Sequence, residues 1–390
     1  MPVQGTSDFP VVYWASLDID EAGTPLDKFA RLVKTSGFLD HLHRSDTVAI
    51  KLHMGELGNV RYLRPIWARV VADMVKEAGA RPFVTDTTTL YKHKRATLHD
   101  YLETAAKNGY TPQSMGCPVI IADGFHNSGT VVRLEGARYE EVPVAQAIYE
   151  ADALVSLAHP TFHPNFPMAG TLKNLGMGAT TKSAKIKMHV QMAAPRYRPE
   201  RCIACWTCIK ICPGNAFCVA DTKDRVEYDP DKCVGCGDCV AECPSGALGI
   251  PWDADMAEIQ RWTLDAARAV LATFEEDKVL HLAVGSDFTP SCDCGPTALP
   301  VVADLGLFAS ADPVALDKAC WDRAHEVALY PGGQLDRLAA APDGPSQDLG
   351  SDRASPLWQK VEPRRFWEEI VPAAGLGSTQ YRLVELEGPG

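Results

Sequence analysis

The cysteines of this chain form the clearest chemical pattern in its sequence. Two segments, residues 202–213 and 233–244, each follow the pattern C-x2-C-x2-C-x3-C-P. The cysteines are Cys202, Cys205, Cys208 and Cys212 in the first copy and Cys233, Cys236, Cys239 and Cys243 in the second. Thiolates at these intervals are typical ligands of iron–sulfur clusters. The repeat therefore predicts that the chain binds metal through sulfur.

The spacing also predicts which thiolates share a cluster. The first three cysteines of one copy bind one [4Fe–4S] cluster, and the cysteine before proline binds the other cluster. The expected ligand sets are Cys202, Cys205, Cys208 and Cys243 for cluster I, and Cys233, Cys236, Cys239 and Cys212 for cluster II. Zinc is the alternative, because C-x2-C also occurs in zinc sites, but zinc does not require the later cysteines or the proline. The repeat resembles bacterial two-cluster ferredoxins, which implies the transfer of single electrons.

A further pair of cysteines, Cys292 and Cys294, lies outside the repeat. In an extended segment residues i and i+2 face the same side, so both thiols can bind one soft metal ion or a cluster edge. They can equally form a redox disulfide, or one can act as a nucleophile while the other resolves the product. Burial of two small residues is the structural alternative, but the surrounding prolines and aspartate argue against an apolar core. We predict a functional site here, with metal ligation and thiol chemistry both open.

Polar side chains also follow several apolar, strand-like runs. His159 and His163 follow residues 153–157, while Lys51 and His53 follow residues 47–50, and Asp86 ends the run 81–86. Ligands of open α/β sheets bind at the carboxyl ends of the strands. We therefore expect these side chains to converge at one edge as ligands or acid–base groups.

The segment 171–189 joins the first half of the chain to the cysteine repeat, and it is rich in glycine and lysine. Gly176 and Gly178 would let backbone N–H groups approach an anion. The expected cofactor-binding residues of this segment are Lys173, Asn174, Gly176, Gly178 and Lys187, with Lys182 and Lys185 nearby and His189 as an acid or base. A flexible basic linker is the alternative. The segment does not match a dinucleotide fingerprint or a phosphate-binding loop.

The elements that position these residues are those of an α/β protein. Apolar strand-like runs alternate with helical patterns over residues 1–195, which predicts a mostly parallel sheet with helices on both faces. The cysteine-rich residues 196–251 interrupt this pattern, as an inserted two-cluster ferredoxin module of α+β type would. The α/β pattern resumes over residues 252–390, with a surface loop predicted at 331–356. Asp312 and Pro313 predict the start of a helix.

Composition limits the partners and the compartment. The net charge of −12 disfavours contact with phosphate backbones, so we expect no nucleic-acid binding. No apolar run approaches the roughly 20 residues of a membrane-spanning helix, and the first residues do not resemble a secretory signal. The 13 cysteines then favour metal binding over disulfides. We expect a cytoplasmic protein that does not enter a membrane.

A wider resemblance covers about residues 47–328. The segments KLHMGE, DTTTLYKHKR, HPTFH, LKNLGMG, KIKMH, the cysteine repeat, CDC and SADPVALD follow one another in this order. Together they resemble the iron–sulfur centre proteins catalogued as domain of unknown function 362. This resemblance implies an α/β domain interrupted by a two-cluster ferredoxin module, and it implies no particular reaction.

We interpret the chain as an iron–sulfur oxidoreductase. Its clusters would pass low-potential electrons to a small anionic substrate or a metal cofactor beside Cys292 and Cys294. An electron carrier for a partner redox enzyme is one alternative. A metallochaperone or cofactor-maturation protein, with an additional metal at the CDC segment, is another.

Overall fold

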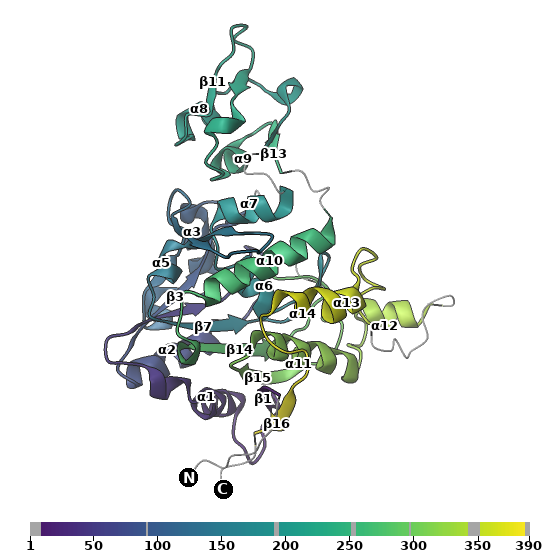
Figure 1. Cartoon of the computed structure of the whole chain (residues 1–390). Helices are drawn as coiled ribbons and strands as arrows, with labels where there is room; N and C mark the ends of the chain where they lie inside the picture. Colours follow the sequence, from purple (N-terminus) through teal and green to yellow (C-terminus); the bar gives the residue numbers. More distant parts are fainter. Residues whose placement is uncertain are drawn as a thin grey trace.

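One large sheet dominates the computed structural model, which describes residues 9–90, 93–190, 195–250, 255–295, 298–341 and 352–386 (Figure 1). Its strands are β1 (Val11–Ala15), β2 (Thr47–Lys51), β3 (Arg81–Asp86), β4 (Val119–Ile121), β7 (Ala153–Ala158), β14 (Val279–Gly285), β15 (Gly306–Ser310) and β16 (Arg382–Glu385). The spatial order is β16-β1-β15-β14-β7-β2-β3-β4. Strands β14, β7, β2, β3 and β4 run parallel to one another, and β15 is antiparallel to both neighbours. The predicted α/β class with a mostly parallel sheet is confirmed.

The central strands are buried on both faces, as parallel strands between helices must be. In β2, Val48 and Ile50 face one apolar cluster, whereas Ala49 between them faces another. Strand β7 alternates in the same way. Because side chains alternate along a strand, an uninterrupted apolar run fills both sides of the sheet.

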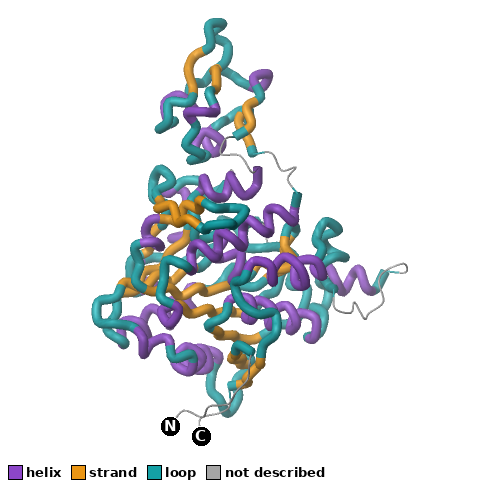
Figure 2. Tube along the Cα trace, in the orientation of Figure 1, coloured by secondary structure: helices purple, strands orange, loops and turns teal. Residues whose placement is uncertain are grey.

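Helices cover both faces of this sheet (Figures 1 and 2). One layer contains α1 (Pro25–Thr35), α2 (Pro65–Glu77) and α3 (Leu98–Lys107), and the other contains α6 (Thr171–Gly176), α10 (Met256–Leu271) and α11 (Pro313–Glu326). The Asp312 side chain accepts hydrogen bonds from the amides of Val314 and Ala315 at 2.8 Å, so the predicted start of α11 is confirmed. The shorter helices are α4 (Pro112–Met115), α5 (Gln146–Tyr149), α7 (Lys182–Val190), α12 (Gln334–Ala339), α13 (Pro363–Arg365) and α14 (Val371–Ala374).

Residues 195–250, here called the cysteine-rich module, stand out from the rest of the fold at the top of Figure 1. The module contains the strand pairs β10 (Arg196–Tyr197) with β13 (Leu248–Gly249) and β11 (Phe217–Val219) with β12 (Val226–Tyr228), and the helices α8 (Thr207–Ile211) and α9 (Asp238–Glu242). Its apolar cluster also includes Leu90 and Ile186 from the α/β body. Lys182 of α7 pairs with Asp238 of α9 at 3.0 Å. Helix α7 therefore connects the module to the body.

Some predicted elements differ in the structure. The predicted loop at 331–356 contains helix α12, because Leu335 is buried against the body; residues 342–351 lie outside the described part. Residues 129–133 form strand β5 in a separate hairpin with β6 (Glu141–Ala145), and β8 (Thr161–His163) pairs with β9 (Phe166–Ala169) in another. Among the helices of the described ranges, none has the length and apolar character needed to cross a membrane.

Candidate functional site

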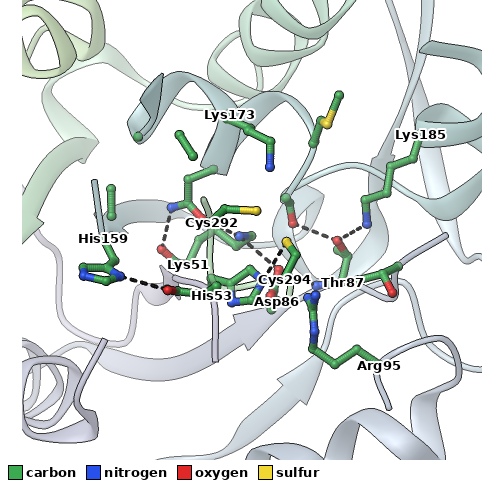
Figure 3. Close-up of a pocket in the computed structure, with 18 of the residues that line it drawn as sticks. Lys51, His53, Asp86, Thr87, Arg95, His159, Lys173, Lys185, Cys292 and Cys294 are labelled. Carbon is green, nitrogen blue, oxygen red and sulfur yellow. Dashed lines mark hydrogen bonds and ion pairs between the residues drawn. The ribbon is translucent and has the colours of Figure 1, made fainter. Parts of the chain in front are cut away.

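A cavity lies at the carboxyl ends of the parallel strands β2, β3 and β7, where the sequence predicts a site (Figure 3). It has an empty volume of about 810 Å³, counting its open mouth. Its walls are Lys51, His53, Asp86, Thr87, Thr89, Leu90, Arg95, Ala158, His159, Ala169, Gly170, Lys173, Asn174, Met177, Gly178, Lys185, His189, Cys292, Asp293 and Cys294. The strand ends, helix α6, helix α7 and the CDC segment thus meet at one place, as ligand sites of α/β sheets do.

The two thiols of the CDC segment differ in protonation. The imidazole Nδ1 of His53 accepts the amide hydrogen of Gly55 at 3.0 Å, so its proton is on Nε2, which lies 3.3 Å from the Sγ of Cys294. A hydrogen bond from the Cys292 thiol, together with the positive charges of Arg95 and Lys173, holds the pKa of Cys294 well below its ordinary value despite burial. The same bond and burial raise the pKa of Cys292. The pair therefore consists of a thiol that donates to a thiolate.

Asp293 fixes the loop that carries the two thiols. Its carboxylate lies 2.9 Å from Nδ1 of His159, and the Nε2 of the same ring lies 2.7 Å from the carbonyl of Ser286. Burial lowers the pKa of His159, but the ion pair with Asp293 outweighs it and the pKa is raised. Both ring nitrogens are occupied as donors. In this arrangement His159 positions the CDC loop, and its predicted role as a ligand or acid–base group stays a prediction.

Lys51 ends β2 and lies fully inside the protein. Its ammonium pairs with Asp86 at 3.0 Å and donates to the side-chain oxygen of Asn174 at 2.6 Å. The Asn174 amide returns a bond to the Lys51 carbonyl at 3.0 Å, and Tyr101 donates to Asp86. Burial lowers the pKa of Lys51. Burial alone would raise the pKa of Asp86, but the Lys51 charge and the Tyr101 hydrogen bond contribute to holding it below its ordinary value. This network makes Lys51, Asp86 and Asn174 a charged but internally paired wall of the cavity.

Helices α6 and α7 add further nitrogen groups. Figure 3 shows the Lys173 ammonium directed into the cavity from above. Lys185 donates to Thr87 Oγ1 and the Thr88 carbonyl, both at 2.5 Å, and burial lowers its pKa to about 8. Burial also lowers the pKa of His189 to about 4, so this ring is neutral near pH 7. Its Nδ1 lies 2.7 Å from the Lys185 carbonyl and carries the proton.

The two glycines of this segment have different roles. A Cβ at Gly178 would lie 2.4 Å from the Lys51 ammonium, so this glycine leaves room for the charged wall of the cavity. A Cβ at Gly176 would lie 2.1 Å from the Thr263 carbonyl of helix α10. Gly176 therefore permits close packing against α10 and is not part of the cavity lining, while its predicted role in anion binding stays a prediction.

Two other predicted residues lie outside the cavity lining. His163 is buried, its Nδ1 accepts the amide hydrogen of Asn165 at 3.0 Å, and burial holds its pKa well below 6.5. The Lys187 ammonium lies 5.1 Å from the ring centre of Tyr139. The direction of each side chain explains these differences, since sequence spacing alone does not specify it.

Arg95, Thr87, Thr89 and Leu90 line the cavity but were not predicted to do so. They belong to the segment DTTTLYKHKR, residues 86–95, whose signals in the sequence were the strand end at Asp86 and its part in the family resemblance. Arg95 is 1% exposed, and its Nε donates to Glu56 at 3.0 Å. A buried arginine cannot be distinguished in sequence from a solvated one.

The repeat cysteines form two groups in the cysteine-rich module. Cys202, Cys205, Cys208 and Cys243 line a cavity of about 330 Å³ together with Trp206. Burial is the main cause that raises the pKa of Cys239. The sulfurs of Cys212, Cys233 and Cys236 lie close enough to raise this pKa further. No three His, Cys, Asp or Glu side chains of the described ranges are arranged around a single metal-ion position.

The fold and the site together define an α/β protein with a thiol- and amine-lined cavity at the carboxyl edge of its sheet. The profile of the family described as domain of unknown function (DUF362) matches residues 48–322, and the chain belongs to this family. The match begins in β2 and ends in α11, so it includes the cavity and the cysteine-rich module.

Comparison with solved structures shows a distant likeness in the fold. The structure of the lactate racemase apoprotein from Thermoanaerobacterium thermosaccharolyticum is similar at a TM-score of 0.35 and 11% identity. The likeness covers 82% of this chain, which spans 58% of the length of that protein. This degree of likeness carries no information on the site. No curated protein matches.

Proposed function

We propose that this protein is an iron–sulfur oxidoreductase whose electrons are used in the cavity beside Cys292 and Cys294. The acceptor is a small anionic substrate or a metal cofactor held there. The electron donor is a partner protein. We also propose a cytoplasmic location, because none of the 13 cysteines forms a disulfide, as is typical of a reducing compartment.

The donor sets of the cysteine-rich module fit two [4Fe–4S] clusters. Each thiolate of such a cluster binds a different iron atom, so its sulfurs surround a space and do not converge on one point. The cavity lined by Cys202, Cys205, Cys208 and Cys243 has this form. The second set, Cys233, Cys236, Cys239 and Cys212, receives amide hydrogen bonds at Cys233 from Gly235 (3.4 Å) and at Cys212 from Ala216 (3.3 Å). When bound, such clusters supply electrons one at a time at potentials set by these contacts.

The position of helix α7 is the single observation that carries the proposal. Lys182 and Ile186 of this helix contact the cysteine-rich module, while Lys185 and His189 line the cavity. Leu90 belongs both to the cavity wall and to the apolar cluster that contains Cys239 and Cys243. The module and the cavity thus share one wall, and a protein that only carried electrons would not require a cavity behind it.

The side chains of the cavity can hold charge and protons. The Cys292 thiol and the Nε2–H group of His53 are hydrogen-bond donors that face the Cys294 thiolate. Lys173 and Arg95 provide positive charge, and Leu90, Ala169 and Met177 exclude water from part of the wall. Electrostatic interactions are stronger in such a water-poor site than in bulk solvent.

Anaerobic purification tests the first half of the proposal. Iron and sulfide analysis should give about 8 of each per chain, and the dithionite-reduced protein should show the electron paramagnetic resonance of reduced clusters. A purified protein that contains zinc in place of iron, or fewer than about 4 iron atoms per chain, would refute the cluster assignment.

Electron use in the cavity needs a separate assay. Reduced methyl viologen is mixed with the protein and a panel of 2-oxo and 2-enoic acids, and dye oxidation is followed. The Cys292→Ser/Cys294→Ser double variant should lose oxidation while its iron content stays unchanged, and the exposed Cys218→Ser serves as the matched control. Equal rates in the double variant and the wild type would refute the cavity as the place where electrons are used and would favour an electron carrier. Loss of an additional metal from the double variant would instead identify a metal cofactor at the CDC segment.

A further inference from the structure

The guanidinium of Arg95 contacts Glu56 and Tyr101. Its Nε donates to Glu56 Oε2 at 3.0 Å, and its carbon lies 5.5 Å from the centre of the Tyr101 ring. Its Nη2 is buried and has no hydrogen-bond partner within the described part of the chain. Figure 3 shows this guanidinium directed upwards to the region of Cys294 and Thr87. An orphan donor on a cation that is 1% exposed is costly unless a ligand accepts from it.

A second orphan donor belongs to the wall of the same cavity. Thr89 is 8% exposed, and its Oγ1 likewise has no partner among the described residues. The Thr89 amide donates to the Arg95 carbonyl at 3.0 Å, so the backbone fixes the two residues against each other. Both residues line the same cavity. Two donors without acceptors in the wall of one cavity indicate that an acceptor group binds there.

The surroundings favour a single negative charge. Lys51, Arg95, Lys173 and Lys185 line the cavity, against the Cys294 thiolate and the carboxylates of Asp86 and Asp293, and Glu56 pairs with Arg95 at 3.0 Å. Those two carboxylates already pair with Lys51 and His159. The remaining wall contains Leu90, Ala158, Ala169 and Met177, which suit a short carbon chain.

We propose that Arg95 Nη2 and Thr89 Oγ1 bind the carboxylate of a small organic acid, with its carbon chain extending toward Cys292 and Cys294. This assignment rests on the proposed function, and it names the substrate class. Two donors match the two oxygens of one carboxylate. A phosphate has more oxygens and more charge than two donors can compensate.

Binding can be measured without any electron transfer. Propionate, crotonate and 2-oxobutyrate are titrated into the anaerobic holoprotein by calorimetry at concentrations up to about 10 mM, with propionamide and inorganic phosphate as comparison ligands. At least one acid should bind, and the amide and phosphate should bind at least about tenfold more weakly. Thr89→Val, which keeps the shape but removes the hydroxyl, should weaken acid binding about tenfold, and Arg95→Lys about 10- to 100-fold.

Thermal unfolding separates a ligand-binding threonine from a structural one. Thr89→Val removes an orphan donor, so the melting temperature of the ligand-free protein should stay constant or rise. Thr85→Val is the matched control, because Thr85 Oγ1 donates to the Ile120 carbonyl at 2.8 Å outside the cavity lining. That variant should melt lower and bind acids normally. For net charge, Lys173→Gln should weaken binding, whereas Lys187→Gln, which removes the same charge outside the cavity lining, should not.

The outcomes distinguish the two proposals. No binding of any acid, equal binding of amide and acid, tighter binding of phosphate, or unchanged affinity in Thr89→Val and Arg95→Lys would each overturn the carboxylate site. Acid binding that depends on Thr89 and Arg95 supports the site even when no dye is oxidised, a result that would count only against the oxidoreductase. Dye oxidation by an acceptor without a carboxylate, unaffected by Thr89→Val, would support the oxidoreductase and overturn the carboxylate site.

Discussion

The hydrogen bond from His53 to Cys294 makes a quantitative prediction about thiol reactivity. In His53→Ala, the Nε2–H that lies 3.3 Å from the sulfur is removed. A hydrogen bond to a charged group contributes about 1.5–3 kcal/mol, and one pKa unit corresponds to 1.36 kcal/mol. Removal of the donor disfavours the thiolate, so the pKa of Cys294 should rise by about 1–2 units. The Cys292 hydrogen bond and the Arg95 charge remain in the variant and continue to lower the pKa of Cys294.

Alkylation by iodoacetamide measures this pKa, because the thiolate and not the thiol reacts. The anaerobic protein is alkylated at a series of pH values, and peptide mass spectrometry separates Cys294 from the other cysteines. Exposed Cys218 gives an internal reference for reagent activity. In the wild type the half-maximal rate at Cys294 should lie well below pH 9, the ordinary value for a thiol. In His53→Ala the half-maximal rate should move to higher pH.

Two further variants make the measurement specific. His53→Gln supplies an amide N–H from a similar position and should restore part of the wild-type profile. His41→Ala removes a half-exposed ring that pairs with Asp277 outside the cavity lining and should leave the profile unchanged. An unchanged profile in His53→Ala, or a shift to lower pH, would refute the assignment of the proton to Nε2. A Cys294 that resists alkylation at every pH would refute a free thiolate.

Three more predictions follow from the same geometry. Lys51→Met leaves the buried Asp86 carboxylate without its cation and should lower the free energy of unfolding by about 3–5 kcal/mol in denaturant melts. Lys107→Met, which breaks an exposed pair with Glu103, should lower it by less than about 1 kcal/mol. Similar losses in both variants would contradict the buried pair. Burial lowers the pKa of Lys185 to about 8 from 10.5, so its ammonium destabilises the fold below pH 8, and this cost should disappear as the pH rises from 8 to 10.5. The wild type should therefore gain stability relative to Lys185→Met over that range, and a constant difference would contradict the lowered pKa. Lys182→Glu should increase hydrogen exchange in α9 by weakening the pair with Asp238, and adding Asp238→Lys should restore protection; no rescue would count against docking through this pair.

Much of the fold could be predicted because its signals are local. Residues 48–50 are all apolar, so a strand formed here has apolar side chains on both faces. Such a run is typical of a strand that is covered on two sides. The pairing of β5 with β6 in a separate hairpin and the helix α12 were not predicted, since pairing partners and the burial of Leu335 depend on distant residues. Strand ends were the best guide to the site, because parallel strands bring their carboxyl ends to one edge.

The detailed chemistry of the site could not be predicted in the same way. His159 had the spacing of a ligand, but both of its ring nitrogens are used by Asp293 and Ser286, more than 120 residues further along the chain. Arg95 and Thr89 had no distinctive spacing, and only the folded chain leaves their donors without acceptors. Hydrogen-bond partners are set by packing across long sequence separations, which a local pattern does not record.

The sequence by itself determined the spacing of the eight repeat cysteines, the α/β class and the strand ends that carry polar groups, because each of these depends on neighbours within a few residues. The tertiary structure alone decided that helix α7 lies between the cysteine-rich module and the cavity, and which charges in that cavity are paired. The physical reason is that burial and pairing belong to the whole packed chain: a lysine or arginine becomes a binding group only when its surroundings remove water and leave a donor unmatched.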